Sequence, residues 1–170
     1  MPFKVNWKGY PQNSLLETTK GIKWVSYPNN RRLYKAHPEE LVRLQTVHFL
    51  FEQMKVPRVR DAIEVELKMS EFDYENTDRA DIVINALDSE GFLVPILVVE
   101  CKANHIELTK QVFDQAVKYD YVLHANNIMI TNGKILKLYY FDIAKQSYVV
   151  RDRIPSYYEM VRKAKLYPIE

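Results

Sequence analysis

Two short apolar runs, rich in β-branched residues, constrain the fold of this chain most. They cover residues 79–84 and 94–102, and each carries charged residues at an end. Runs of this length and composition are typical of β-strands. If the two strands are neighbours, Asp81, Glu100 and Lys102 come together at the end of a sheet. Because side chains two residues apart along a strand share a face, Glu100 and Lys102 point the same way.

Two carboxylates and an ammonium group at a sheet end are costly unless they are solvated, paired or bound to a metal ion. Carboxylate oxygens suit Mg²⁺, which polarises a phosphoryl oxygen and lowers the pKa of bound water. A lysine beside them can orient or activate that water and offset charge in the transition state. The alternative is a strand-end carboxylate paired with a lysine at the surface, because Glu-x-Lys is common by chance.

The composition is that of an ordinary globular protein. The 170 residues are 47% hydrophobic and 27% charged, and they include one cysteine. A single cysteine excludes an internal disulfide framework and favours a reducing compartment. The first residues lack the apolar stretch of a secretory signal, and the longest apolar run, residues 92–99, is too short to cross a bilayer. We therefore expect a cytoplasmic protein without a membrane partner.

Charge divides the chain near residue 36. Residues 1–36 contain seven Lys and Arg against one acid, whereas residues 37–150 contain twelve against eighteen. The first segment interleaves aromatic and basic residues, which suits base stacking and phosphate contact. The same pattern suits an arm whose aromatic side chains pack on the core, and we favour this interpretation. We expect a basic and aromatic arm over residues 1–36 and one domain over residues 37–170, including a C-terminal helix.

Hydrophobic periodicity predicts helices around a central sheet. Helical spacing of apolar residues indicates helices over residues 38–54 and 107–124, and a further helix is expected near 155–165. Alternating or β-branched runs indicate strands over residues 63–68, 79–84, 94–102, 128–131, 135–141 and 148–151, with turns or loops at 28–30, 70–78, 88–91 and 132–133. This order predicts an α/β fold (α+β mixed sheet), with helices flanking the sheet.

The spacing of the charged residues resembles the PD-(D/E)xK pattern of restriction endonucleases. Asp81 is followed, after eighteen residues, by Glu100-x-Lys102, and Ala80 stands where the name of the pattern has proline. Further stretches occur in the same order: Arg31-Arg32-x-Tyr34, Pro38-Glu39-Glu40-x-Val42-Arg43, Arg79, Gln115-x-x-x-Tyr119 and Thr131-Asn132-Gly133. Over residues 30–141 the chain resembles the N-terminal nuclease domain of type I restriction enzyme R subunits and the stand-alone proteins that share it.

This resemblance implies a restriction-endonuclease-like fold and metal-dependent cleavage of DNA. It implies that Asp81 and Glu100 are catalytic ligands of Mg²⁺, with Mn²⁺ as a substitute, and that the Cys101 carbonyl is a third ligand. Lys102 would position or activate the attacking water. Glu40, rather than Glu39, would be the catalytic acid that the first helix contributes.

Four other residues are implied as site support or DNA contacts, namely Arg43, Arg79, Gln115 and Tyr119. Gln115 and Tyr119 lie four residues apart, on one face of the second expected helix. From these residues alone, we favour the interpretation that Tyr119 is a core aromatic with a satisfied hydroxyl and that Gln115 is a solvated helix residue.

Type I R subunits carry an ATP-driven translocase after the nuclease. This chain has four glycines and no Gly-x-x-x-x-Gly-Lys-Ser/Thr loop, so we expect no ATP site in it. The partners implied are DNA, a separate specificity or motor protein and, because a duplex has two strands to cut, a second copy in a homodimer. Two alternatives stay open: a non-catalytic nucleic-acid-binding or regulatory protein on the same fold, and a nuclease of RNA or structured DNA.

Overall fold

The computed structural model describes residues 3–4, 15–17, 23–27, 33–72 and 78–170. Its elements, in chain order, are β1 (Phe3–Lys4), β2 (Leu15–Glu17), β3 (Lys23–Ser26), β4 (Leu33–Lys35), α1 (Pro38–Glu52), η2 (Arg60–Ala62), β5 (Ile63–Lys68), η3 (Met69–Glu71), β6 (Arg79–Leu87), β7 (Leu93–Cys101), α2 (Lys110–Leu123), β8 (Asn127–Thr131), β9 (Ile135–Asp142), β10 (Ser147–Val150) and α3 (Tyr157–Lys163). The expected helices and strands are all present. The two short 3₁₀ helices, η2 and η3, were not expected. The predicted turn at 28–30 lies outside the described residues.

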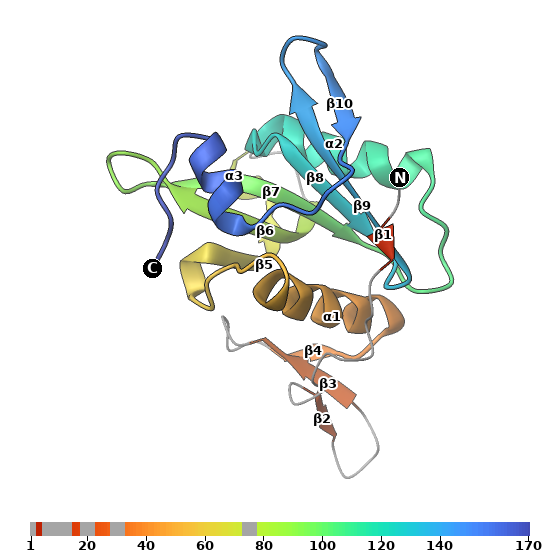
Figure 1. The fold of residues 1–170 in the computed structure, drawn as a ribbon. Helices are drawn as coiled ribbons and strands as arrows, with labels where there is room; N and C mark the ends of the chain where they lie inside the picture. The colour runs from red at the N-terminus through yellow and green to blue at the C-terminus, as the bar shows by residue number, and fades with distance from the viewer. Residues whose placement is uncertain (1–2, 5–14, 18–22, 28–32, 73–77) are drawn as a thin grey trace.

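Within the described part of the chain, a seven-stranded mixed sheet forms the centre of the fold. Its order is β1-β9-β8-β7-β6-β5, with β10 paired to β9. A second sheet, β2-β3-β4, lies beyond α1 as seen from the main sheet (Figure 1). The α/β architecture with helices flanking a mixed sheet confirms the predicted fold class.

Alternating side chains let the central strands bury both of their faces. On one face, Ile82 and Val99 belong to the large core cluster that also holds the apolar side chains of α1 and α3. On the other face, Ile130 packs with Val112 and Ala116 of α2. Helices α1 and α3 thus cover one face of the sheet and α2 covers the other, and the strand ends stay available for polar side chains.

The register of β6 and β7 decides where the charged residues lie. These strands are antiparallel and pair Ile82 with Val99, so Asp81 and Glu100 are the next residues along the two strands. Strand β7 then runs parallel to β8 and pairs Cys101 with Thr131. The Lys102 amide continues this contact by donating to the Thr131 carbonyl at 2.8 Å.

The arm contributes to the core rather than lying apart from it. Val25, Tyr27 and Tyr34 are all buried and belong to the same apolar cluster as α1. The rings of Tyr27 and Tyr34 meet edge to face, with centroids 5.4 Å apart. The interpretation that the arm packs aromatics on the core is therefore confirmed for these two tyrosines; the side chains of Trp7, Tyr10 and Trp24 lie outside the described residues.

Candidate active site at the ends of strands β6 and β7

The structure brings together the three charged residues that the sequence pattern singled out. The Cys101 amide donates to Asp81 Oδ2 at 2.8 Å, which joins the ends of β6 and β7. The Lys102 Nζ atom lies 2.9 Å from Glu100 Oε1. Asp81 is 8% exposed and Glu100 is 2% exposed, so the carboxylates are screened from water. The Cys101 side chain points to the opposite face and is buried in the core, as expected.

Burial disfavours the charge on both carboxylates. It is the main cause that raises the pKa of Asp81, although Arg43 and the Cys101 amide act in the opposite direction. Burial also raises the pKa of Glu100, and the neighbouring charge of Asp81 raises it further against the opposing effect of Lys102. Two neighbouring carboxylates with raised pKa values make a site that gains from an added cation.

Lys102 is the ammonium group of this site. Burial acts to lower its pKa, but the hydrogen bond and the charge of Glu100 outweigh burial, so the pKa is raised. The Nζ atom also donates to Gln115 Oε1 at 3.2 Å. Lys102 therefore stays protonated and is held between a strand carboxylate and a helix amide.

Gln115 and Tyr119 extend this chain of contacts along α2. The Gln115 Nε2 atom donates to the Tyr119 hydroxyl at 3.1 Å. Tyr119 is buried with the apolar side chains of Ala80 and Val83, so it is a core aromatic whose hydroxyl has a partner. Gln115 is only half buried, but its contact with Lys102 shows that it is more than a solvated helix residue.

Arg43 joins three carboxylates on the α1 side of the site. Its Nη2 atom donates to Glu40 Oε2 at 2.7 Å. Its Nη1 atom lies 3.4 Å from Glu66 Oε1 and 3.7 Å from Asp81 Oδ1. Burial acts to lower the pKa of Arg43, but Asp81 and Glu40 outweigh burial and raise it. Arg43 therefore remains a buried cation that compensates these acids.

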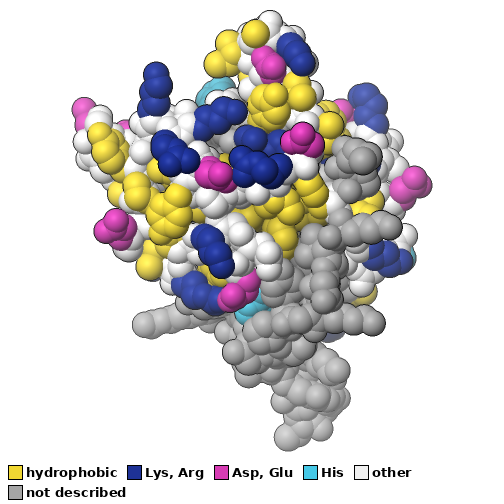
Figure 2. Space-filling view, in the orientation of Figure 1, with side chains coloured by type: hydrophobic (Ala, Val, Ile, Leu, Met, Phe, Trp, Pro, Cys, Tyr) yellow, Lys and Arg dark blue, Asp and Glu magenta, His cyan; other side chains and the backbone are white. Residues whose placement is uncertain are grey.

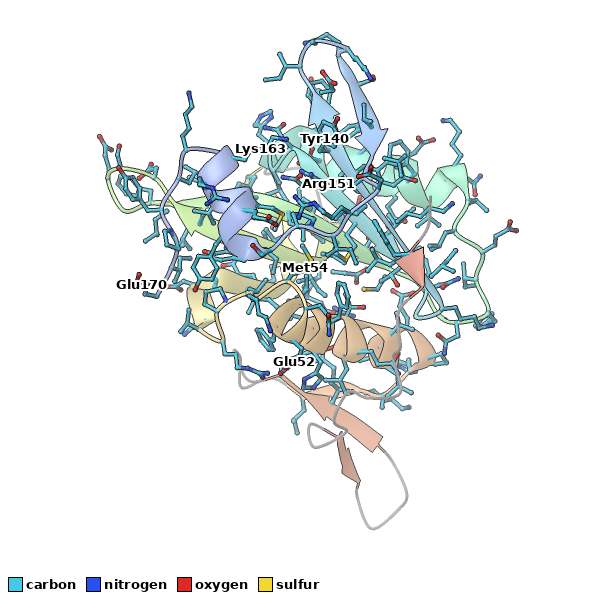
Figure 3. The ribbon with its side chains drawn as sticks, viewed as in Figure 1. Glu52, Met54, Tyr140, Arg151, Lys163 and Glu170 are labelled. Carbon is cyan, nitrogen blue, oxygen red and sulfur yellow. The ribbon has the colours of Figure 1, made fainter. Side chains whose placement is uncertain are left out.

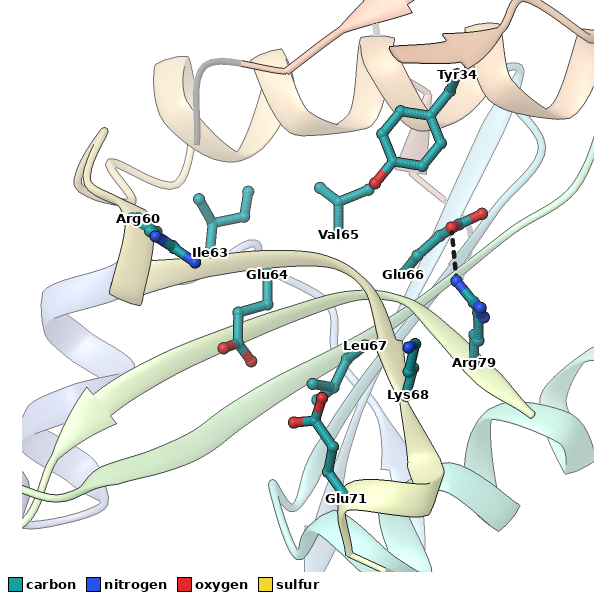
Figure 4. A pocket seen from close by; sticks show the side chains of 10 residues that line it. All are labelled: Tyr34, Arg60, Ile63, Glu64, Val65, Glu66, Leu67, Lys68, Glu71 and Arg79. Carbon is teal, nitrogen blue, oxygen red and sulfur yellow. Dashed lines mark hydrogen bonds and ion pairs between the residues drawn. The ribbon is translucent and has the colours of Figure 1, made fainter. Parts of the chain in front are cut away.

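Arg79 lies at the outer side of the same group. Its Nη1 atom is 3.3 Å from Glu66 Oε2, and its side chain is 40% exposed. Figure 4 shows this pair beside Tyr34 in a hollow along β5 with a cavity volume of about 230 Å³. Arg79 is thus joined to Asp81 only indirectly, through Glu66 and Arg43.

The structure separates the two acids of the first helix turn. Both Glu40 oxygens are engaged, since Oε1 accepts from the Tyr27 hydroxyl at 2.6 Å and Oε2 accepts from Arg43. In contrast, the charge of Glu39 raises the pKa values of Asp81, Glu100 and Lys102. The role of Glu40 as the acid that the first helix contributes stays a prediction, and in the structure Glu40 is held by Tyr27 and Arg43.

A tight loop holds the backbone that follows Lys102. The Asn132 side chain donates to the Ile106 carbonyl at 2.9 Å, and Gly133 has φ +80°. A Cβ atom at Gly133 would lie 2.5 Å from the Asn104 side-chain oxygen. The Asn-Gly turn therefore does more than close the β8–β9 hairpin, because it also packs against the segment that leaves the site.

Two residues of the network escaped the sequence argument. Tyr27 stands in a segment without periodicity, so no pattern showed that its hydroxyl reaches Glu40. Glu66 was expected as one residue of an alternating strand, but it has φ +54°. The left-handed backbone interrupts the β5–β6 pairing between Val65 and Leu67, at the position opposite Asp81. A glutamate in an alternating strand pattern gives no indication in the sequence of a left-handed backbone.

The carboxylate oxygens of Asp81 and Glu100 suit a divalent cation, although the described side chains do not form a complete set of metal ligands. Among the described residues, no three His, Cys, Asp or Glu side chains converge as metal ligands. Asp81 and Glu100 nonetheless supply hard carboxylate oxygens next to each other, with their negative charge only partly offset by Lys102. These are the ligand types that Mg²⁺ and Mn²⁺ prefer.

A mixed sheet flanked by helices, with its acids and lysine at the ends of two central strands, is consistent with a restriction-endonuclease-like core. Residues 38–155 match the family described as type I restriction enzyme R protein N terminus. The match covers most of the chain, so the protein belongs to this family, as the sequence motifs indicated. Searches among curated proteins and among solved structures gave no match. No helix in the described ranges has the length and apolar character needed to traverse a bilayer.

Proposed function

We propose that this protein is a metal-dependent endonuclease that hydrolyses phosphodiester bonds in DNA. The observation that carries the proposal is the position of Lys102, held between Glu100 and Gln115 with Asp81 on the neighbouring strand. Membership in a restriction enzyme family supports a nuclease-like role. The family alone does not identify the residues, so the proposal depends on the geometry of this cluster.

Asp81 and Glu100 would hold a Mg²⁺ or Mn²⁺ ion, and the Cys101 carbonyl would be a third ligand. When bound, such an ion stabilises charge on a phosphoryl group and lowers the pKa of water. The protein prepares this site by fixing Asp81 through the Cys101 amide. Glu40 is our candidate for the acid of the first helix, because Arg43 joins it to Asp81.

Lys102 acts as a fixed ammonium group in this proposal. Because its pKa is raised, it serves to position the attacking water and offset phosphoryl charge rather than to remove a proton as a base. Gln115 limits the movement of the lysine, and Tyr119 in turn anchors Gln115 to the core. Arg43 keeps Asp81 in place from the α1 side.

The test is cleavage of supercoiled plasmid and of single-stranded DNA with Mg²⁺ or Mn²⁺. We expect Lys102→Ala to abolish cleavage, whereas Lys118→Ala, an exposed lysine on the same side of the fold paired with Asp78, should cleave like the wild type. Circular dichroism would verify that both variants fold. Full activity of Lys102→Ala would show that the site is wrongly placed.

Metal binding gives a second, independent measurement. Calorimetric titration with Mn²⁺ should show binding to the wild type and weaker binding to Asp81→Asn, which keeps the shape of the side chain and removes its charge. Wild-type protein that neither binds metal nor cleaves would contradict the proposal. Metal binding without cleavage would instead indicate that a partner protein is needed.

A further inference from the structure

A second hollow lies at the start of β8, beside the end of β9 and α3. It has a cavity volume of about 240 Å³ and is lined, among others, by Asn127, Tyr140, Arg151, Met160 and Lys163. Asn127 begins β8 and donates from its side chain to the Ile96 carbonyl of β7 at 2.9 Å. Glu100 is four residues further along β7, which at about 3.3 Å per residue is roughly 13 Å away. The hollow is therefore separate from the candidate active site.

Two cations in this hollow lie close to the same aromatic ring, that of Tyr140. The guanidinium carbon of Arg151 lies 4.8 Å from the centre of the Tyr140 ring, and the Lys163 Nζ atom lies 5.1 Å from it. Figure 3 shows these three side chains converging between α3 and the β9–β10 hairpin. None of the described residues that line the hollow carries a carboxylate. The nearby Glu159 is already paired with Arg153, whose Nη1 atom is 3.1 Å from Glu159 Oε2.

The fold accounts for the position of each cation separately, but not for the presence of both beside one ring. Lys163 lies in the last turn of α3, where the helix dipole favours a cation. Arg151 donates from Nη2 to Asn127 Oδ1 at 2.9 Å, yet its Nε atom is buried without a hydrogen-bond partner. Burial lowers the pKa of Arg151, and Arg153 adds to this effect, whereas Tyr140 and Glu159 oppose it. Two like charges beside one ring, with no carboxylate among the lining residues, form a site that an anion would stabilise.

The surrounding surface is basic and partly apolar. Figure 2 shows Lys and Arg side chains gathered across the middle of this face, with Asp and Glu side chains among them and apolar side chains above and below. Ile143, which also lines the hollow, is 76% exposed, and Met160 forms part of its floor. An anionic group attached to a flat or apolar body would match both features.

We propose that this hollow binds the phosphate group of a nucleotide, with Arg151 and Lys163 as its charged partners. Arginine donates in a planar fork that suits phosphate oxygens, and lysine adds a point charge. Pockets that enclose a whole small molecule measure about 300–1,000 Å³. The present hollow is smaller, so it takes the phosphate and part of the attached sugar or base, and the rest of the nucleotide stays outside. This site does not depend on the proposed nuclease activity.

The experiment measures binding in EDTA, so that no divalent ion supports nucleotide binding at the carboxylate cluster. Calorimetry would use inorganic phosphate, deoxyadenosine monophosphate, and a single-stranded oligonucleotide with or without a 5′-phosphate. We expect the wild type to bind the nucleotide and Lys163→Gln to bind it about tenfold more weakly, as loss of one charge-assisted contact worth about 1.4 kcal/mol predicts.

Lys145→Gln is the matched control. Lys145 is exposed in the turn between β9 and β10 and does not line the hollow, but its substitution removes the same charge. Equal affinity of wild type and Lys163→Gln, equal weakening by both variants, or no binding of any probe at millimolar concentration would each overturn the proposal. Tighter binding of the oligonucleotides than of the free nucleotide would identify a nucleic-acid strand as the source of the phosphate. The reverse order would identify a free nucleotide.

Discussion

At the scale of single residues, Arg43 sets the balance of charge around the candidate active site. It lies within 4 Å of carboxylate oxygens from Glu40, Glu66 and Asp81. Its side chain is 6% exposed, so water contributes little to its solvation. The buried acids and the buried cation therefore stabilise one another, and removing Arg43 leaves three carboxylates without the cation that they share.

The free energy of unfolding should report this dependence. We expect Arg43→Gln to lose about 3–5 kcal/mol in urea denaturation, the usual cost of breaking a buried pair. Arg79→Gln is the control, because Arg79 pairs with the same Glu66 but is 40% exposed; its cost should stay below about 1 kcal/mol. Similar losses for the two variants would contradict the role given to Arg43.

His48 of α1 should make stability depend on pH. Burial lowers the pKa of His48, and the charge of Arg58 lowers it further. The unfolded chain therefore takes up the proton at a higher pH than the folded chain does. The contribution of His48 to stability should fall as the pH drops below the unfolded value of about 6.5, whereas the raised pKa values of Asp81 and Glu100 act in the opposite direction. Urea denaturation of wild type and His48→Leu between pH 7.5 and 5.5 would show a smaller decline in the variant; parallel declines would exclude His48 as the cause.

The sequence identified some site residues and missed others for a physical reason. Asp81, Glu100 and Lys102 were found because strand periodicity alone places them together. The choice between Glu39 and Glu40 depends on the rotation of α1, since neighbouring helix residues point about 100° apart. That rotation is set by packing against Val25, Tyr27 and the sheet, which are contacts between distant parts of the chain.

At the scale of elements, β5 shows how a correct strand prediction can miss the local backbone. Ile63–Lys68 forms the expected strand, and its side chains alternate between buried and less buried positions up to Leu67. Within it, Glu66 adopts φ +54° and reaches both Arg43 and Arg79. A left-handed residue other than glycine costs roughly 1–2 kcal/mol, so the ion pairs of Glu66 stand against backbone strain.

The strained backbone at Glu66 predicts that glycine and alanine substitutions there change stability in the reverse of their usual order. Both Glu66→Ala and Glu66→Gly remove the carboxylate, but only glycine adopts φ +54° without strain. We expect Glu66→Gly to be about 1 kcal/mol more stable than Glu66→Ala in urea denaturation. At Glu64, in the same strand but without positive φ, the usual order should hold and glycine should be the less stable variant. Alanine more stable than glycine at both positions would rule out strain at Glu66.

At the scale of the whole molecule, the structure shows that the basic first segment forms part of the core, as expected. Strands β2, β3 and β4 are only three or four residues long, which is too short to produce a recognisable alternation in the sequence. The segment nevertheless supplies Val25, Tyr27 and Tyr34 to the core beside α1. Tyr27 also donates to Glu40, so the arm reaches the charge network that supports Asp81 through Arg43.

A chain shortened to residues 37–170 should therefore lose most of its stability. Val25, Tyr27 and Tyr34 are 0%, 1% and 8% exposed, and burying a large apolar side chain contributes about 1.5–3 kcal/mol. Their combined loss approaches the whole stability of a typical domain, about 5–15 kcal/mol. Thermal unfolding followed by circular dichroism should show a much lower midpoint or no cooperative transition. Full-length Tyr27→Phe, which loses only the hydrogen bond to Glu40, should cost about 1 kcal/mol. If the shortened chain unfolds at the same midpoint as the full chain, the segment is an appendage and its contacts with α1 contribute nothing to stability.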